Sequence, residues 1–185
     1  MHPKPHRLMI SGSSLALSMV LLLAALTAQA SATHFGFQKN TFNVKFPPKG
    51  AVYTIDIDGS AKIPGKPIVK PVSVDIELKV ANVKQKGVPT IHFALTAGKF
   101  SFGDDVYMLD KGSAVMQVNK MNIKATSNDG TKILLVTAAL SAPLPIKTSE
   151  DPVKLVPGQD RKSASIQALA VKWDLTFGGI ISRTG

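Results

Sequence analysis

The chain has 185 residues, and its 22 lysine and arginine side chains against 12 aspartate and glutamate side chains give a formal net charge of +10. It contains no cysteine, which excludes thiol nucleophiles, zinc–thiolate sites, iron–sulfur clusters and lipidation at a cysteine. The part that follows residue 32 is long enough for one domain with its own hydrophobic core.

The N-terminus has the pattern of a secretory signal peptide. Lys4 and Arg7 precede an apolar run over residues 15–26, which is shorter than the roughly 20 residues of a membrane-spanning helix. Two overlapping small-residue sites follow it, Ala28-Gln29-Ala30 and Ala30-Ser31-Ala32. A charged leader, a short apolar segment and an A-x-A site together are typical of a segment that directs export.

We therefore expect a signal peptide over residues 1–32 that is cleaved after Ala30 or Ala32. The remaining residues, 33–185, would form a secreted or extracytoplasmic domain. The alternative is an uncleaved N-terminal membrane anchor, in which the apolar run would extend back to Leu8.

The first predicted strand covers residues 41–46, where Phe42, Val44 and Phe46 alternate with polar residues. Pro47-Pro48-Lys49-Gly50 ends it. The simplest expectation is that this strand joins its own sheet. Because a proline hinge sets it apart, self-association through residues 41–46, by donation to the sheet edge of a second copy, is the alternative.

Residues 52–57 form the next predicted strand. Asp58-Gly59 predicts a two-residue hairpin turn after it, because a type I′ turn needs positive φ angles that this pair tolerates. The returning strand would cover residues 61–63, and a Pro/Gly-rich connector would follow over residues 64–71.

Residues 72–83 carry the clearest strand pattern of the chain. Apolar side chains from Val72 to Val80 alternate with polar ones from Ser73 to Lys79. Strict alternation predicts one buried face and one face in contact with solvent. The chain is expected to turn directly afterwards, at residues 85–87.

Glycines divide the next stretch into short predicted segments. After a strand over residues 91–95, Gly98 and Gly103-Asp104-Asp105 are expected to interrupt the chain. Lys111-Gly112 predicts a further hairpin turn, which leads into a strand over residues 113–121.

Asn128-Asp129-Gly130 is the strongest hairpin signal, because it lies between two segments rich in β-forming residues, 121–126 and 131–140. The second segment is almost continuously apolar, which predicts a strand that is buried on both faces. A Pro-rich loop over residues 142–162 follows, with a short edge strand at residues 153–156 inside it.

The last predicted strand covers residues 169–177 and ends at Gly178-Gly179. A helix over residues 163–173 is the alternative, because Ile166 and Trp173 lie at helical spacing, but the period-2 alternation continues for longer. Roughly nine short strands without a convincing helix predict a single all-β domain. We expect an antiparallel β-sandwich, with a small closed β-barrel as the alternative.

No residue is assigned a catalytic, cofactor-binding or metal-ligating role from the sequence. His34 would lie second in a chain that begins at Thr33, a position that common amino-terminal copper motifs do not use. His92 lies alone on the polar face of its strand, and two histidines are too few for a zinc site. The chain also lacks G-x-S-x-G, P-loop and G-x-G-x-x-G motifs.

Several carboxylates are candidates for a binding or catalytic site. Asp56-Ile57-Asp58-Gly59 and Asp104-Asp105 look like fragments of calcium loops, but turn chemistry accounts for both, because Asp side chains hydrogen-bond to the nearby backbone. Asp75 and Glu77 are expected to form a solvated stripe on one strand face. A glycosidase-like acid pair is the alternative, because such pairs form in space rather than in sequence.

Tyr53-Thr54-Ile55-Asp56 resembles the opening string of YceI-like lipocalin-fold proteins. The resemblance covers these four residues, and the rest of the chain does not follow the family's pattern. It implies a barrel that carries long apolar lipids.

The absence of a catalytic motif favours an exported, non-enzymatic module that binds or assembles at the cell surface. The alternatives are a barrel that carries an apolar ligand and a hydrolase that acts on polymers. Lysines supply nearly all of the positive charge and are scattered singly, which favours a soluble, edge-protected β surface. The alternative is attraction to anionic polymers or the cell surface, the partners that such a charge would select. Specific nucleic-acid binding is not expected, because its readers rely on arginine forks and stacked aromatic rings.

Overall fold

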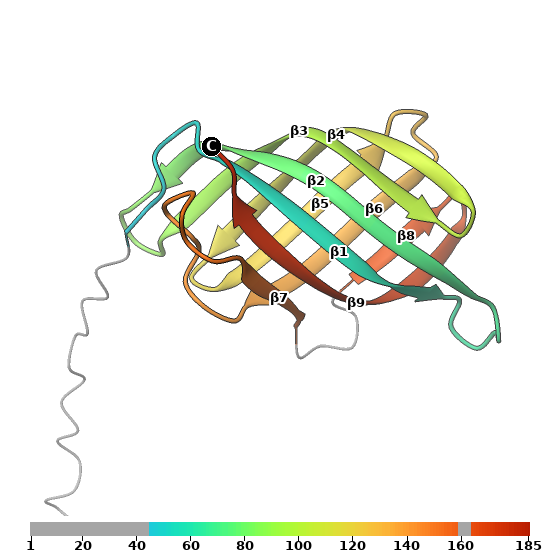
Figure 1. The fold of residues 1–185 in the computed structure, drawn as a ribbon. Helices are drawn as coiled ribbons and strands as arrows, with labels where there is room; N and C mark the ends of the chain where they lie inside the picture. The colour runs from blue at the N-terminus through green and yellow to red at the C-terminus, as the bar shows by residue number, and fades with distance from the viewer. Residues whose placement is uncertain (1–44, 159–163) are drawn as a thin grey trace, which may run out of the picture. The chain divides into compact units, whose positions relative to one another are not determined.

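The computed structural model describes residues 45–158 and 164–185 (Figure 1). These residues form nine strands and no helix: β1 (Val52–Lys62), β2 (Val69–Lys84), β3 (Thr90–Phe102), β4 (Asp105–Gln117), β5 (Lys120–Ser127), β6 (Lys132–Leu140), β7 (Val153–Pro157), β8 (Ala164–Ala168) and β9 (Val171–Arg183). Within this part of the chain, no helix has the length and hydropathy to cross a bilayer. The all-β prediction is confirmed.

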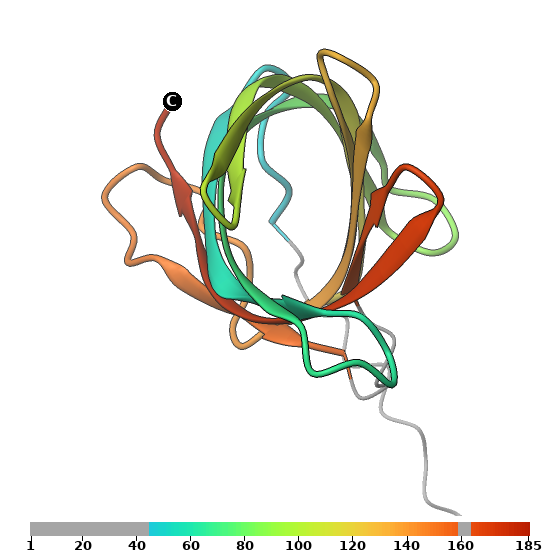
Figure 2. The ribbon, with the colours of Figure 1, turned by 90° about the vertical axis from the view of Figure 1, so that its right-hand side faces the viewer.

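The strands close into an eight-stranded antiparallel barrel. β1 pairs with β2 on one side and with β9 on the other, so the last strand returns to the first. The short strands β7 and β8 share one position in the wall, where both pair with β6 and β9. Figure 2 looks along the barrel and shows this closure. The sandwich prediction is therefore wrong, and its alternative, the closed barrel, is confirmed.

Alternating side chains fill the inside of the barrel. On β2, Val74, Ile76 and Leu78 are buried while the residues between them reach the outer face. Tyr53 of β1 meets Phe93 of β3 edge to face, with the ring centroids 5.8 Å apart, although β2 lies between these strands. Burying each large side chain contributes about 1.5–3 kcal/mol, so this interior is the main source of stability.

The end of the barrel at Tyr53, called here the Tyr53 end, is covered by the β6–β7 loop. The Tyr53 hydroxyl donates a hydrogen bond to the carbonyl oxygen of Pro145 at 2.6 Å, and Leu144 beside it is buried. Burial raises the pKa of Tyr53 to about 12, so its hydroxyl keeps the donated proton at all ordinary pH values.

The opposite end, called here the Trp173 end, is closed by aromatic rings. Phe102 of β3 and Trp173 of β9 meet edge to face with centroids 5.0 Å apart. The Lys70 ammonium lies 4.9 Å from the Phe102 ring centroid, and that of Lys132 lies 4.7 Å from the Tyr107 centroid. Each lysine therefore makes a cation–π contact at this end of the barrel.

Several predicted turns and strands are confirmed. The β2–β3 turn contains residues 85–87, and the β5–β6 turn contains Asn128-Asp129-Gly130. Gly130 has a φ of 71°, and the Asp129 carboxylate accepts hydrogen bonds from Ser127 Oγ and from the Thr131 backbone N–H. These bonds lower the pKa of Asp129 to about 2, because they favour the ionised carboxylate.

Three glycines predicted to interrupt strands lie inside them. Gly59 belongs to β1, Gly98 to β3 and Gly112 to β4, so the hairpin turns predicted at Asp58-Gly59 and Lys111-Gly112 are wrong. A Cβ atom on Gly59 would lie 2.1 Å from the Thr176 carbonyl oxygen, and one on Gly112 would lie 2.7 Å from the Lys124 carbonyl oxygen. These glycines permit close approach of a neighbouring strand rather than a turn.

The predicted boundaries of the C-terminal strands differ from those in the structure. The predicted strand over 169–177 is two strands, because the chain turns at Leu169-Ala170 between β8 and β9. Gly178-Gly179 does not end the last strand, which runs on to Arg183. The alternative helix over 163–173 is wrong for its described residues, 164–173, which lie in β8, this turn and β9.

Two predictions about the preceding segments need correction. The Pro-rich loop predicted over residues 142–162 contains β7, which pairs on both sides and is therefore not an edge strand. The β6 strand is not buried on both faces, since its Leu135 side chain is 41% exposed. The signal peptide, His34 and residues 41–44 lie outside the described residues, so self-association through residues 41–46 stays a prediction.

Candidate functional site

Carboxylates gather on one part of the barrel wall and are absent from another. The outer faces of β1 and β2 carry Asp56, Asp58, Asp75 and Glu77. By contrast, β5 to β8 contain lysines and no acidic residue. We call the outer face of β5 to β8, whose charged side chains are all lysines, the cationic wall, and the middle of the β1–β2 pair, where these four carboxylates lie together, the acidic wall.

The acidic wall brings two carboxylates together. Asp56 and Asp75 lie opposite each other in the β1–β2 register, and Lys99 forms an ion pair with Asp75 at 3.1 Å. Burial raises the pKa of Asp56, and a hydrogen bond with Asp75 and the negative charges of Asp75 and Asp58 raise it further. Both carboxylates lie on regular strands rather than in the loop that a calcium site needs.

The described residues contain no group of three or more histidine, aspartate or glutamate side chains placed to hold a metal ion. Asp104 lies in the β3–β4 turn, and Asp105 begins β4, where it accepts a hydrogen bond from the Tyr107 hydroxyl at 3.3 Å. His92 is exposed on β3, as its place on the polar face predicts.

We expect Asp56→Asn to stabilise the protein by about 0.5 kcal/mol at neutral pH, because it removes a like-charge pair across two strands. The folded protein binds the Asp56 proton more tightly than the unfolded chain does. This contribution to stability is therefore present below the ordinary pKa of 3.8 and is lost as pH rises through the raised value. Urea unfolding from pH 3 to 7, in which wild type and variant differ increasingly with pH, would check this; a constant difference would contradict it.

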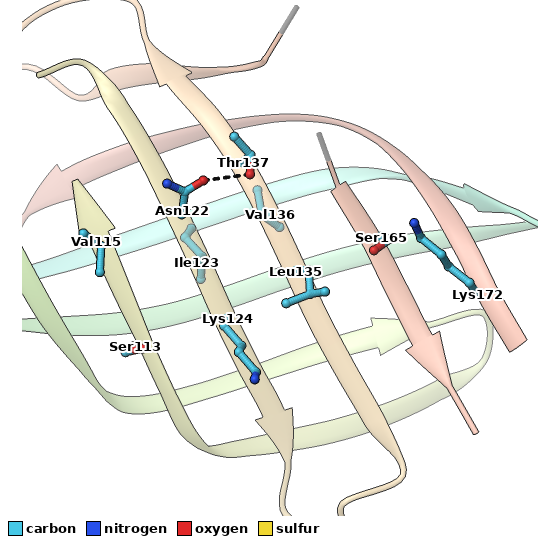
Figure 3. Close-up of a pocket in the computed structure, with 10 residues that line it drawn as sticks. All are labelled: Ser113, Val115, Asn122, Ile123, Lys124, Leu135, Val136, Thr137, Ser165 and Lys172. Carbon is cyan, nitrogen blue, oxygen red and sulfur yellow. Dashed lines mark hydrogen bonds between the residues drawn. The ribbon is translucent and has the colours of Figure 1, made fainter. Parts of the chain in front are cut away.

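The outer face of the cationic wall contains a depression of about 450 Å³ (Figure 3). The strand register builds it from two rows of outward-facing residues. One row runs from Val115 through Asn122 to Thr137, and the other runs from Ser113 through Lys124 and Leu135 to Ser165. Lys172 of β9 and the buried residues Ile123 and Val136 complete the lining.

The lining combines cationic, amide and hydroxyl groups. The Thr137 hydroxyl donates a hydrogen bond to the Asn122 side-chain oxygen at 2.8 Å, which leaves the Asn122 amide N–H groups available to a ligand. Ser165 is only 6% exposed, whereas Lys124 and Lys172 are exposed. Neither lysine forms an ion pair with another described residue. The lining residues include no carboxylate and no aromatic ring.

Asp174 lies beside this site. It lies opposite Ser165 on one side and opposite Lys62 on the other, and it does not line the depression. The depression can therefore offer positive charge and hydrogen-bond donors to an anion, and the Asp174 carboxylate is not part of its lining.

Sequence reasoning did not select Lys124, Lys172 or their neighbours. Alternation alone places their side chains on the outer face. Which outward residues become neighbours depends on the pairing of β4, β5, β6 and β8, and no local pattern specifies it. Leu135 misled the prediction, since an apolar residue on the solvent face made β6 look buried on both sides.

A barrel that carries an apolar ligand would hold it inside, so the side chains that point inward are relevant to this alternative. The string Tyr53-Thr54-Ile55-Asp56 begins β1, with Tyr53 and Ile55 directed inward and fully buried. Large side chains such as Phe100, Leu134 and Ile166 are likewise buried against one another. An eight-stranded barrel has an interior that its own side chains can fill or that can hold one small ligand, and here large apolar side chains point into it.

No family model, curated protein or solved structure matches the chain.

Proposed function

We propose that the protein is an exported, non-enzymatic binding module whose cationic wall holds an anionic polymer of the cell surface. The observation that carries this proposal is the depression over β4, β5, β6, β8 and β9, which contains two lysines without a described ionic partner and no carboxylate. An anionic ligand would meet complementary charge and several hydrogen-bond donors there.

The chemistry of the lining favours an acidic glycan over a nucleic acid. Lysine presents a compact, hydrated charge that suits carboxylate and sulfate groups, and Asn122, Thr137 and Ser113 offer partners for sugar hydroxyls. The lining residues include neither the arginine forks nor the aromatic rings that nucleic-acid readers use.

The alternatives draw less support from the geometry. A hydrolase of polymers needs two carboxylates that face a bound substrate, and the lining of the depression supplies none. A carrier of apolar ligands needs room inside the barrel, and large side chains such as Phe100 and Leu134 take up part of that interior. Export rests on the apolar run over residues 15–26 and the small-residue sites that follow it.

Replacing both lysines, as Lys124→Ala with Lys172→Ala, is expected to raise the dissociation constant for an acidic glycan at least about tenfold, because two charge-assisted hydrogen bonds are lost. Calorimetry with polygalacturonate and heparin as probes, and neutral dextran as a blank, would measure this. Binding of the wild type should weaken steeply as salt rises, since the contacts are exposed.

The matched control is Lys79→Ala with Lys84→Ala, two exposed lysines of β2 outside the depression. It makes the same change in net charge and should leave the dissociation constant nearly unchanged. Equal weakening by both pairs would show that binding follows net charge alone, and the depression would then not be the site. No binding of either acidic probe by the wild type would overturn the proposal.

A further inference from the structure

More than half of the exposed large hydrophobic side chains in the described chain belong to hairpins at the Trp173 end. Two of these hairpins are neighbours, because β1 pairs with β9. Ile68 and Val69 of the β1–β2 hairpin are 47% and 60% exposed, and Leu169 at the tip of the β8–β9 hairpin is 76% exposed. Figure 2 faces this end and shows both hairpins on the rim of the barrel.

The same two hairpins are positively charged. The β1–β2 hairpin carries Lys62, Lys66 and Lys70, and residues 59–74 contain no acidic residue. Lys172 follows Leu169 closely in the β8–β9 hairpin, and residues 164–173 are likewise free of acidic residues. Each hairpin therefore combines solvent-exposed aliphatic side chains with lysines, and neither of these two stretches of chain contains a carboxylate.

We propose that these two hairpins dock on the surface of an anionic lipid bilayer. Aliphatic tips flanked by lysines are suited to the membrane interface, where the apolar side chains enter the headgroup region and the ammonium groups meet lipid phosphates. A protruding rim cannot enclose a small ligand, and the positive charge of these two hairpins complements an anionic surface.

Docking by this end would also orient the molecule. The β3–β4 turn on the same rim contains Asp104, and the β5–β6 turn contains Asp129, so these parts of the rim would be repelled by anionic headgroups. The barrel would therefore contact the bilayer through the β1–β2 and β8–β9 hairpins. This inference does not depend on polymer binding, and its tests leave the depression unchanged.

The absence of cysteine makes a direct test available. Single cysteines introduced as Ile68→Cys and Leu169→Cys would carry an environment-sensitive fluorophore, with Val88→Cys and Val118→Cys as controls. Val118 is the close match to Leu169, because it is 73% exposed and has the same φ of 56°, but it lies in the β4–β5 turn at the Tyr53 end.

On adding phosphatidylglycerol-containing vesicles, we expect a blue shift of the fluorophore at residues 68 and 169, none at residues 88 and 118, and a weaker response to pure phosphatidylcholine. All variants would be prepared from the exported protein in the same way, so that any membrane affinity of the N-terminus is common to all. A shift at all four positions, or at none, would overturn the proposal.

Unlabelled variants give a second readout by vesicle co-sedimentation. Lys66→Gln should lower the partition coefficient about fivefold, the effect of one lysine at an anionic surface. Ile68→Ser combined with Leu169→Ser should lower it at least about tenfold, with an unchanged circular dichroism spectrum. If this pair bound vesicles as tightly as the Val88→Ser and Val118→Ser pair, the aliphatic tips would not be the docking surface.

Discussion

Gly59→Ala is expected to destabilise the barrel by about 3 kcal/mol, because the added methyl group would collide with the backbone of β9. The new Cβ atom would lie 2.1 Å from the Thr176 carbonyl oxygen and 2.9 Å from the Phe177 Cα atom. Neither atom belongs to a side chain that could rotate away, so the β1–β9 pairing that closes the barrel would have to open locally. Urea unfolding at neutral pH would measure the loss.

Gly178→Ala is the control for this prediction. Gly178 lies on the facing strand opposite Asp58, one position from the Gly59–Phe177 pair, and a Cβ atom there would meet no other heavy atom within 4 Å. We expect its free energy of unfolding to stay within about 0.5 kcal/mol of the wild type. Equal destabilisation by the two substitutions would mean that strand propensity, and not the close approach of β9, explains the glycine at residue 59.

The same glycine shows where sequence reasoning fails. A glycine after an aspartate fits a hairpin turn, and it fits equally well a strand that another backbone approaches closely. Gly59 and Gly112 belong to the second case, which depends on contacts with β9 and β5 that are remote in sequence or set by the register. At Gly130 the turn prediction was right, because the Asp129 carboxylate also fixes the turn locally.

The period-2 alternation predicted the strands and their inward faces well, as in β2, but it could not choose between a sandwich and a barrel. Both architectures bury one face of each strand. The difference lies in whether β1 pairs with β9, and this pairing joins the two ends of the described sheet. The two short strands β7 and β8 occupy one position in the barrel wall, and this arrangement likewise depends on tertiary pairing.

The candidate site could not be predicted from the sequence, for a related reason. Lys124 and Lys172 are two lysines among many, and their spacing in the chain carries no signal. They line one depression only because β8 and β9 complete the wall beside β6. The overall positive charge did point to an anionic partner, while the separation of an acidic wall from a cationic wall followed from the fold.

Trp173→Ala is expected to cost about 3–5 kcal/mol of stability, because it removes the ring that closes one end of the barrel. The Trp173 side chain is buried against Phe102 at 5.0 Å between centroids, and the two rings come from strands separated by β1 and β2. The Lys70 ammonium covers both rings, at 4.9 Å from Phe102 and 5.9 Å from Trp173. Removing the indole would leave a cavity that opens to water and would deprive both partners of their contact.

Two further variants separate packing from charge at this end. Trp173→Phe keeps a ring opposite Phe102 and should cost less, about 1–2 kcal/mol. Lys70→Met keeps the aliphatic stem but removes the ammonium, and we expect a loss of about 0.5–1 kcal/mol from the cation–π contacts. Because Trp173 is the single tryptophan of the chain, far-ultraviolet circular dichroism should follow unfolding in place of fluorescence. A loss below about 1 kcal/mol for Trp173→Ala would show that the Phe102–Trp173 pair does not hold the barrel closed.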